Sequence, residues 1–354
     1  MTSEQTIVVT GGAGFIGSAL VRHLIAETET RVVTVDRLGY AGSLLNLHDV
    51  RDHQRHHFEQ VDITNGTALS DVFARHQPTA VMHLAAESHV DRSIDRPADF
   101  IQSNLVGTYQ VLDCSLRYLA TLNAPQAARF RMLHVSTDEV YGSLSLDAPA
   151  FREGDAYQPN SPYSASKAGA DHLAMAWAHT FGLPVLITNC TNNYGPYQFP
   201  EKLIPVVIMK ALAGQPIPIY GRGDNIRDWL HVDDHVRALT LILERGRLAQ
   251  RYNIGGECEV SNLQLVKQIC ALLDDLEPSP SGTPYAQLIQ FVDDRPGHDL
   301  RYAMDISKVR TEFDWQPQHT LVNGLRETVT WYLANRAWCE QVTNNDAGQR
   351  QGLR

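Results

Sequence analysis

Two short segments of this chain carry side chains that could do acid and base chemistry together. Tyr163 and Lys167 lie in a run without helix breakers after Pro162, so on a helix the two side chains share one face. An ammonium group beside a phenol stabilises the phenolate, which is expected to lower the pKa of Tyr163 from about 10. The other segment, Ser136-Thr137-Asp138-Glu139, offers hydroxyl groups and two adjacent carboxyl groups. The phenol could remove a proton from a substrate hydroxyl, and the carboxyl groups could act as a further acid and base.

The N-terminal elements predict a site for a dinucleotide. A strand at Thr6–Val9 leads into Gly11, Gly14 and Gly17 and then into a helical apolar pattern. In such a strand–turn–helix unit the glycines make a tight turn, let a pyrophosphate approach the backbone, and let helix and strand pack closely. Free N–H groups at the helix N-terminus would face the phosphates.

The residue after the second strand predicts which dinucleotide is bound. This strand, Arg31–Val35, ends in Asp36, whose carboxylate can accept hydrogen bonds from ribose hydroxyls and would repel a 2′-phosphate. Arg37 argues the other way, because an arginine near that position can hold the extra phosphate. The pattern favours NAD over NADP.

Further buried-strand patterns predict a Rossmann-like, doubly wound parallel α/β sheet. They lie at Ala80–Ala86, Arg131–Val135 and Leu183–Thr188. Open sheets of this kind bind ligands at the carboxyl ends of their strands. The segment from Ser136 to Glu139, just past the strand Arg131–Val135, is therefore expected in that crevice.

Together these motifs resemble a known family. Tyr-x-x-x-Lys is similar to the catalytic pair of the short-chain dehydrogenase/reductase superfamily, and Asp138 and Glu139 add groups that suit removal of water. The run from Asn189 to Pro205 matches the family nearly residue for residue. Over roughly residues 5–340 the chain resembles the nucleotide-sugar 4,6-dehydratases, most closely those acting on dTDP-glucose.

The resemblance implies an NAD-dependent hydro-lyase of deoxysugar (such as rhamnose) biosynthesis. The product would be dTDP-4-keto-6-deoxy-glucose plus water. Tyr163, with Lys167 and Thr137, would take the proton of the sugar 4-hydroxyl while hydride passes from carbon 4 to NAD. Glu139 would remove the hydrogen of carbon 5, Asp138 would protonate the departing 6-hydroxyl, and the hydride would return to carbon 6.

The resemblance also assigns binding residues, and no metal ligands. The implied cofactor residues are Gly11, Gly14, Phe15, Ile16, Gly17, Asp36, Arg37, Leu38, Asp62, Ile63, Leu84, Ala85, Ala86, Ser103, Tyr163, Lys167 and Asn193. The implied substrate residues are Ser88, Thr137, Asn192, Lys202, Leu203, Pro218, Tyr220, Arg227, Asn262, Arg295 and His298. The segment between Gly142 and Pro162 is shorter than in many family members. The resemblance therefore does not say how the substrate reaches the active site.

Discontinuous domains and a homodimer are also implied. An NAD-binding Rossmann domain would comprise residues 1–188 and 228–256, and a smaller mixed α/β nucleotide-sugar-binding domain residues 189–227 and 257–340. A polar tail would follow at 341–354. The helices Asn104–Leu122 and Ser164–Thr180 would form the dimer interface. Leu276–Pro284, rich in Pro and Ser, predicts an exposed loop.

Composition and charge exclude several kinds of partner. The net charge of −10 argues against nucleic acid, which needs a basic surface. Five scattered cysteines without a Cys-x-x-Cys motif indicate reduced thiols, and neither a signal peptide nor a membrane-spanning run is recognisable. His53, His56 and His57 predict a polar loop rather than a metal site. We expect a cytoplasmic protein that binds a small molecule.

Other functions remain open: another nucleotide-sugar 4,6-dehydratase, a 4-epimerase, and a cofactor-binding sensor or scaffold on the same fold. An epimerase needs the Tyr and Lys but no paired carboxylates. GDP-mannose dehydratases typically carry Thr-Ser-Glu at the strand end, so Asp138 argues against them. Non-catalytic relatives commonly lose Tyr or Lys, and both are present in this chain.

Overall fold

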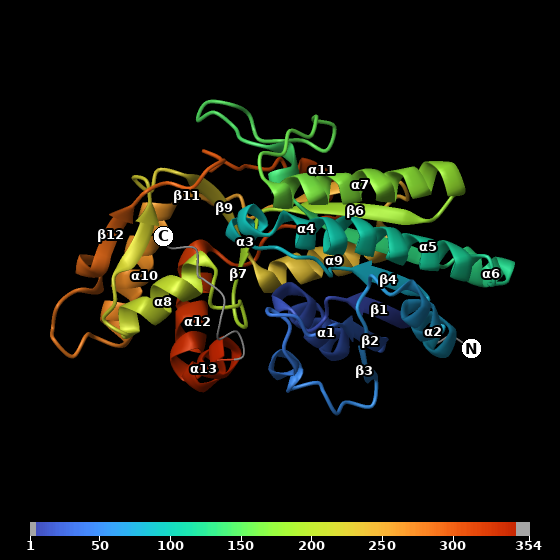
Figure 1. Ribbon diagram of the computed structural model, residues 1–354, viewed down its shortest axis with the longest axis horizontal. Helices are drawn as coiled ribbons and strands as arrows, with labels where there is room; N and C mark the ends of the chain where they lie inside the picture. Colours follow the sequence, from blue (N-terminus) through green and yellow to red (C-terminus); the bar gives the residue numbers. More distant parts are fainter. Residues whose placement is uncertain (1–4, 345–354) are drawn as a thin grey trace.

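The computed structural model of this protein, which describes residues 5–344, is built around a seven-stranded parallel sheet (Figure 1). Its strand order is β10-β6-β5-β4-β1-β2-β3, and every neighbouring pair is parallel. The strands are β1 (Thr6–Thr10), β2 (Arg31–Asp36), β3 (His56–Gln60), β4 (Ala80–His83), β5 (Arg131–Thr137), β6 (Val185–Cys190) and β10 (Arg251–Ile254). The predicted doubly wound α/β fold is confirmed.

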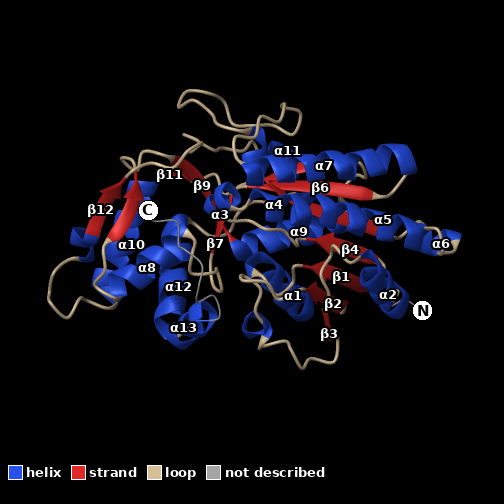
Figure 2. Ribbon diagram, viewed as in Figure 1, coloured by secondary structure: helices blue, strands red, loops and turns tan. Residues whose placement is uncertain are grey.

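Helices cover both faces of this sheet, which explains why its central strands are mostly apolar, whereas the edge strand β3 is mostly polar (Figure 2). One face packs against α1 (Phe15–Glu27) and α9 (Val232–Arg245), and the other against α2 (Gly66–His76), α5 (Gly107–Leu119) and α7 (Pro162–Phe181). Successive strand residues point to opposite faces. Within β1, Ile7 and Val9 belong to the first core and Val8 to the second. Both faces are therefore buried, as is typical of parallel sheets.

A smaller part of the chain has its own hydrophobic core, centred on residues such as Ile208, Leu265 and Val329. Figure 1 shows it on the left, beside the carboxyl ends of the main strands. Its sheets are β11-β9-β7 and β12-β8. Its elements are β7 (Asn192–Tyr194), β8 (Ile217–Tyr220), β9 (Ile226–His231), β11 (Glu259–Ser261), β12 (Ile289–Val292), α8 (Leu203–Leu212), α10 (Asn262–Leu276), α12 (Leu321–Ala334) and α13 (Arg336–Asn344). The residue boundaries of the two domains stay a prediction.

Short helices complete the described part of the chain. They are η1 (Leu44–Leu47), α3 (Val90–Asp95), α4 (Pro97–Phe100), η2 (Ile101–Val106), α6 (Ala124–Ala127), η3 (Asp138–Tyr141), η4 (Tyr285–Leu288) and α11 (Ser307–Phe313).

Two strands run farther than their apolar patterns predict. β5 continues to Thr137 and β6 to Cys190, because the parallel ladder extends to the pairs Ser136–Asn189 and Thr137–Cys190. Backbone groups pair in a ladder whether the side chains are polar or apolar. Ser136 and Thr137 therefore belong to the strand, and only Asp138 and Glu139 lie past its end.

The remaining expectations about organisation can be placed on the structure. Residues 281–284 are exposed, as predicted for the loop after α10. Helix α13 occupies residues 341–344 of the expected polar tail, and residues 345–354 lie outside the described part. Over the described residues, no helix has the length and apolar character needed to cross a membrane.

Candidate active site

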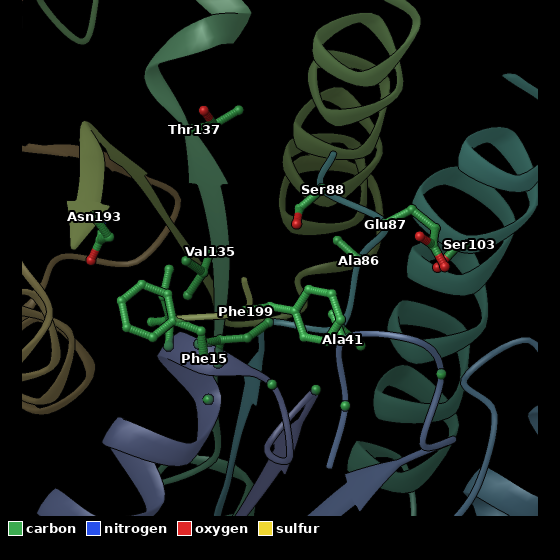
Figure 3. Close-up of a pocket in the computed structure, with 18 of the residues that line it drawn as sticks. Phe15, Ala41, Ala86, Glu87, Ser88, Ser103, Val135, Thr137, Asn193 and Phe199 are labelled. Atoms are coloured by element: carbon green, nitrogen blue, oxygen red, sulfur yellow. The ribbon is translucent and has the colours of Figure 1, made fainter. Parts of the chain in front are cut away.

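A cavity of about 300 Å³ lies at the carboxyl ends of β1, β2, β4 and β5, where open α/β sheets bind ligands. Figure 3 shows that its lining side chains, such as Phe15, Ser103, Thr137 and Asn193, come from separate segments. The lining includes these residues predicted to hold the cofactor: Gly11, Gly14, Phe15, Ile16, Gly17, Asp36, Arg37, Asp62, Ile63, Leu84, Ala85, Ala86, Ser103, Tyr163, Lys167 and Asn193. The structure therefore brings these predicted residues together along one cavity.

The glycine turn fits a dinucleotide diphosphate. Gly11 has a φ of +71°, and a Cβ there would lie 2.6 Å from the backbone nitrogen of Ala85. A Cβ at Gly17 would lie 2.1 Å from the carbonyl oxygen of Gly11, so helix and turn are in direct backbone contact. Gly14 caps α1 without a side chain, and the first turn of α1 carries no acidic residue. The N-terminal N–H groups of α1 are thus available to an anion in the cavity.

Asp36 is fixed by backbone hydrogen bonds at the rim of the same cavity. Its carboxylate accepts from the backbone N–H groups of Ala13 at 3.0 Å and Leu38 at 2.8 Å. Burial raises the pKa of Asp36, and these two N–H groups oppose the rise. A carboxylate oriented in this way suits ribose hydroxyls.

Arg37, the residue that argues for NADP in the sequence, is engaged with other side chains. Its guanidinium donates to Glu87 and, at 3.4 Å, to Asp62. Because its charge is offset by two carboxylates, Arg37 is poorly placed to bind a 2′-phosphate. The side chain of Leu38 packs against the sheet core and is absent from the lining of both cavities described for residues 5–344. Leu38 acts on the site through its backbone contact with Asp36.

Tyr163 and Lys167 lie on the first two turns of α7. Ser161 caps this helix in a capping box, and Pro162 occupies its first turn, so the sequence fixes where the helix begins. Both side chains are buried and line the cavity, and Lys167 Nζ donates to the carbonyl oxygen of Val135 at 2.9 Å.

The sequence predicts a lowered pKa for Tyr163, and this prediction is wrong for the protein without a bound ligand. Burial raises the pKa of Tyr163 well above its usual value, and the charge of Glu139 raises it further. Burial has the largest effect, because a buried phenolate loses the water that stabilises it. The phenol of the free site is therefore held in its protonated form.

A buried carboxylate that sequence reasoning missed supports Lys167. Asp171, one turn farther along α7, is fully buried and contacts His134 Nε2 at 3.1 Å and the hydroxyl of Tyr157 at 2.8 Å. Burial lowers the pKa of Lys167, and the charge of Asp171 raises it. Asp171 thus helps to keep the ammonium group charged.

Asp138 and Glu139 in η3 have different proton affinities. Burial raises the pKa of Asp138 well above its usual value, and the charge of Glu139 adds to the rise. Burial also raises the pKa of Glu139, but Arg295, Arg227 and Lys202 oppose it. Asp138 therefore favours its protonated form, and Glu139 is the carboxyl group that ionises more readily. Such a separation distinguishes an acid from a base at one site.

The elevated pKa of Asp138 predicts a pH-dependent cost in stability. The folded protein holds this proton above the unfolded pKa of about 3.9, so folding becomes less favourable as the pH rises through the window above that value. Asp138→Asn removes the titration. We expect the free energy of unfolding of this variant to exceed that of the wild type by more at pH 8 than at pH 5, widening by at most about 1.4 kcal/mol per pH unit.

Urea denaturation at the two pH values measures this difference. Asp99→Asn is the control, because Asp99 forms an exposed ion pair with Arg96. A difference between Asp138→Asn and wild type that stays constant from pH 5 to pH 8 would contradict the expected burial of a protonated carboxyl group.

A second cavity, of about 350 Å³, adjoins the first and lies against the smaller part of the chain. It is lined by these residues predicted to bind the substrate: Ser88, Asn192, Lys202, Leu203, Pro218, Tyr220, Arg227, Asn262, Arg295 and His298. Thr137 lines only the first cavity. Both cavities share Ser88, Glu139, Asn192, Phe199, Glu201 and Lys202, so Glu139 lies at their junction.

Three of the cationic side chains that line the second cavity are Arg227, Arg295 and Lys202, and each is held by neighbouring groups. Arg227, 5% exposed, donates to the carbonyl oxygens of Asp299 at 2.9 Å and Ile226 at 2.8 Å. Arg295 donates to Asp91 at 3.0 Å, and its Nε has no hydrogen-bond partner among residues 5–344. Lys202 Nζ donates to the carbonyl oxygen of Ser88 at 2.8 Å. This arrangement provides a cationic surface for a phosphorylated ligand.

Asn104 has a positioning role. Its amide accepts from the backbone N–H of Glu87 at 2.8 Å and donates to the carbonyl oxygen of Glu87 at 3.0 Å and to Ser166 at 2.9 Å. It thereby ties the turn after β4 to α7. Sequence reasoning missed the lining residues Tyr40, Glu87, Cys190, Phe199 and Glu201.

One group of potential metal ligands lies away from both cavities. His231, Asp233 and His319 place ligand atoms within 4.8 Å of one another. The two imidazole rings stack with centroids 4.0 Å apart. Because the lone pairs of imidazole lie in the ring plane, stacked rings do not both point at one ion. The stack connects the end of β9 to the start of α12.

Comparison with known proteins places these features in a family context. A family model described as GDP-mannose 4,6 dehydratase matches residues 8–328. A dTDP-glucose 4,6-dehydratase of Shigella flexneri is 55% identical over 344 residues, covering 95% of each chain. One from Escherichia coli is 52% identical over 358 residues, covering 98% of this chain and 99% of the relative.

Solved structures agree with these similarities. The dTDP-glucose 4,6-dehydratase DesIV from Streptomyces venezuelae, solved with NAD and TYD bound, is 43% identical with a TM-score of 0.86. The match covers 96% of this chain and 100% of the DesIV chain. A UDP-glucose 4-epimerase from Thermus thermophilus in complex with NAD is 26% identical with a TM-score of 0.81, covering 94% of this chain and 100% of that chain.

Proposed function

The chain belongs to the family of nucleotide-sugar 4,6-dehydratases, and from this premise we propose that it converts dTDP-glucose to dTDP-4-keto-6-deoxy-glucose and water, with NAD as cofactor. One observation carries the proposal most: Asp138 and Glu139, with unequal proton affinities, line the first cavity together with Tyr163 and Lys167, and Glu139 lies where the two cavities meet. A 4-epimerase would need no such carboxyl pair.

NAD is the cofactor that the first cavity suits. The glycine turn and the N-terminus of α1 would hold the diphosphate, Asp36 would accept hydrogen bonds from the ribose hydroxyls, and Arg37 is already paired with Glu87. When bound, NAD supplies the hydride acceptor and later the hydride donor. Because the hydride returns in each cycle, NAD is expected to stay bound as a prosthetic group.

The first step is oxidation at carbon 4 of the sugar. Tyr163 takes the proton of the 4-hydroxyl as the hydride departs, and the ammonium of Lys167 stabilises the phenolate that results. Because burial and the charge of Glu139 raise the pKa of Tyr163, the phenolate needs a nearby positive charge, and Lys167 supplies it. Thr137, at the end of β5, offers its hydroxyl to the same region.

Elimination of water follows from the unequal carboxyl groups. The new ketone acidifies the hydrogen on carbon 5, and Glu139, whose ionised form three nearby cations favour against the effect of burial, removes it. Asp138, which retains its proton, protonates the departing 6-hydroxyl. The hydride would then return to carbon 6 while Glu139 gives its proton back to carbon 5, which forms the saturated 4-keto sugar. The proton that Tyr163 took from the 4-hydroxyl leaves to solvent, and Asp138 takes up a proton from solvent, so the site is restored.

The second cavity orients the substrate by its charged end. Arg227, Arg295 and Lys202 hold the diphosphate, and Asn192 and Tyr220 contribute further polar contacts. Support comes from the cationic lining and from the unpaired Nε of Arg295 within the described chain. The glucose ring then extends toward Glu139 at the junction with the first cavity.

Incubation with a panel of nucleotide sugars tests the substrate. Mass spectrometry should detect loss of one water from dTDP-glucose, with no added reductant. Dehydration of GDP-mannose or a UDP-sugar in preference to dTDP-glucose would overturn the substrate assignment, and inversion at carbon 4 without loss of water would indicate an epimerase.

Arg227→Lys should weaken binding of the nucleotide diphosphate. Lysine keeps the charge but loses the planar pair of donors that matches phosphate oxygens. We expect the KM for dTDP-glucose and the Kd for dTDP to rise about 10- to 100-fold with a smaller change in kcat. Arg222→Lys is the matched control, because Arg222 forms an exposed pair with Asp224. Unchanged dTDP affinity in Arg227→Lys would remove Arg227 from the diphosphate site.

A homodimer is the proposed assembly. Helices α5 and α7 pack together, and Ile101, Tyr109 and Phe181 beside them are 47%, 39% and 52% exposed. Trp177 stacks edge-on against both Tyr109 and Phe181. An apolar surface of this kind suits a second copy of the chain. Light scattering should give twice the chain mass of 39.5 kDa, and a monomer at micromolar concentration would overturn it.

We also propose that the enzyme works in the cytoplasm. All five cysteines are free thiols, and four of them are buried. Thiols persist in a reducing compartment. Fractionation of cells that express the protein would test this location, and recovery outside the cytoplasm would contradict it.

A further inference from the structure

The loop after β2 reaches across the first cavity to the smaller part of the chain. Tyr40, in this loop, packs edge-on against Phe199 with ring centroids 5.7 Å apart. Tyr40 and its neighbour Ala41 both pack against the core of the smaller part. Figure 3 shows Ala41 and Phe199 at the same end of the cavity. A loop of the cofactor-binding sheet is thus anchored in the opposite half of the molecule.

An arginine also lies over the Tyr40 ring. Arg92 of α3 places its guanidinium carbon 3.7 Å from the ring centroid, within the range of a cation–π interaction. Arg92 Nε also donates to Glu201 Oε2 at 3.1 Å. The side chains of Arg92 and Glu201 are only 16% and 6% exposed. Tyr40, Arg92 and Glu201 therefore join three segments that are distant in sequence.

The position of these residues relates them to the cofactor. Tyr40, Phe199 and Glu201 line the first cavity, and Arg92, Phe199 and Glu201 line the second. Moving the loop away from the first cavity would withdraw the Tyr40 ring from an apolar core and leave Arg92, the partner of Glu201, without the ring against which it lies. Both changes expose buried groups to water and oppose opening.

We propose that Tyr40, Arg92 and Glu201 form a clasp that retains NAD in the first cavity between the two hydride transfers. The inference rests on the proposed function, which requires that NADH stays bound until its hydride returns. The clasp acts on cofactor retention and takes no part in proton transfer. Its loss should increase the rate of NAD release and leave the chemical steps intact.

Bound NAD in the purified protein tests the clasp directly. The nucleotide released on denaturation is quantified by chromatography, and its dissociation is followed by exchange into labelled NAD. Tyr40→Ala and Glu201→Gln should release NAD about 10- to 100-fold faster than wild type, since each removes a partly buried aromatic or charged contact. Saturating NAD should restore kcat for Tyr40→Ala to within about threefold.

Matched variants distinguish the clasp from general disruption. Tyr40→Phe keeps the ring and should retain NAD as the wild type does. Arg92→Ala should lose it, whereas Arg96→Ala should not, because Arg96 lies nearby in an exposed ion pair with Asp99. Thermal unfolding with saturating NAD identifies a variant that fails to fold, and Glu201→Gln then carries the test because it preserves shape.

Retention that stays within about twofold of wild type in both Tyr40→Ala and Glu201→Gln overturns the clasp. Equal loss from Tyr40→Phe and Tyr40→Ala also overturns it, because the ring would then be irrelevant. NAD retention is measured without substrate, so failure of the clasp is distinguishable from failure of the proposed reaction.

Discussion

Tyr163→Phe is expected to abolish most turnover while leaving both binding sites intact. The phenylalanine ring can keep the packing of Tyr163 against Phe100, whose centroid lies 6.2 Å away. Only the hydroxyl that exchanges a proton with the 4-hydroxyl is lost. Removing a group that transfers a proton typically costs about 10²- to 10⁴-fold in rate, and we expect kcat to fall by this factor.

The measurement combines steady-state kinetics with bound NAD and dTDP affinity. The NAD content and the Kd for dTDP should stay within about twofold of wild type, which separates lost chemistry from lost binding. Tyr109→Phe is the control, since Tyr109 lies partly exposed on α5. A kcat within about tenfold of wild type would show that another group accepts the proton.

Glu139→Gln is expected to stop the reaction after the first hydride transfer. The variant keeps Tyr163 and Lys167, so carbon 4 can still be oxidised, but it lacks the carboxylate that removes the hydrogen of carbon 5. NADH should accumulate on the enzyme in a single turnover, visible by its near-ultraviolet absorbance. The overall kcat should fall about 10²- to 10⁴-fold.

Asp138→Asn provides the matched comparison for Glu139→Gln. It removes the acid and keeps the base, so in heavy water it should still exchange the hydrogen of carbon 5 with solvent while losing little 6-hydroxyl. Glu139→Gln should show neither exchange nor elimination. Exchange at the wild-type rate in Glu139→Gln would contradict its role as the base, and equal exchange rates in both variants would mean that the two carboxyl groups are not specialised.

Most residues predicted to hold the cofactor line one cavity, because the motifs that carry the prediction are local. The glycine turn between β1 and α1 and the carboxylate at the end of β2 lie in one short unit whose geometry follows from residue type. Asp138 and Glu139 follow β5 directly, so their place at the carboxyl edge of the sheet follows from strand order. Their different environments could not be predicted, because Arg227 and Arg295 come from far along the chain.

The features that sequence reasoning misses depend on contacts between distant segments. The contact of Tyr40 with Arg92 and Phe199 joins residues that no local pattern relates. Apolar patterns end β5 and β6 too early, because polar residues continue the ladder without an apolar signal. The spacing of Tyr163 and Lys167 predicts the wrong direction for the pKa of Tyr163. The sequence shows the neighbouring ammonium group but not the degree of burial.

The central claim is that one hydride leaves carbon 4 and returns to carbon 6 of the same sugar through a retained cofactor. dTDP-glucose with deuterium at carbon 4, incubated with purified protein and no added NAD, tests it most directly by mass spectrometry and NMR. The account predicts loss of one water with deuterium at carbon 6 of the 4-keto product. Deuterium that remains at carbon 4 with inversion, or a dehydrated product without label at carbon 6, would contradict it.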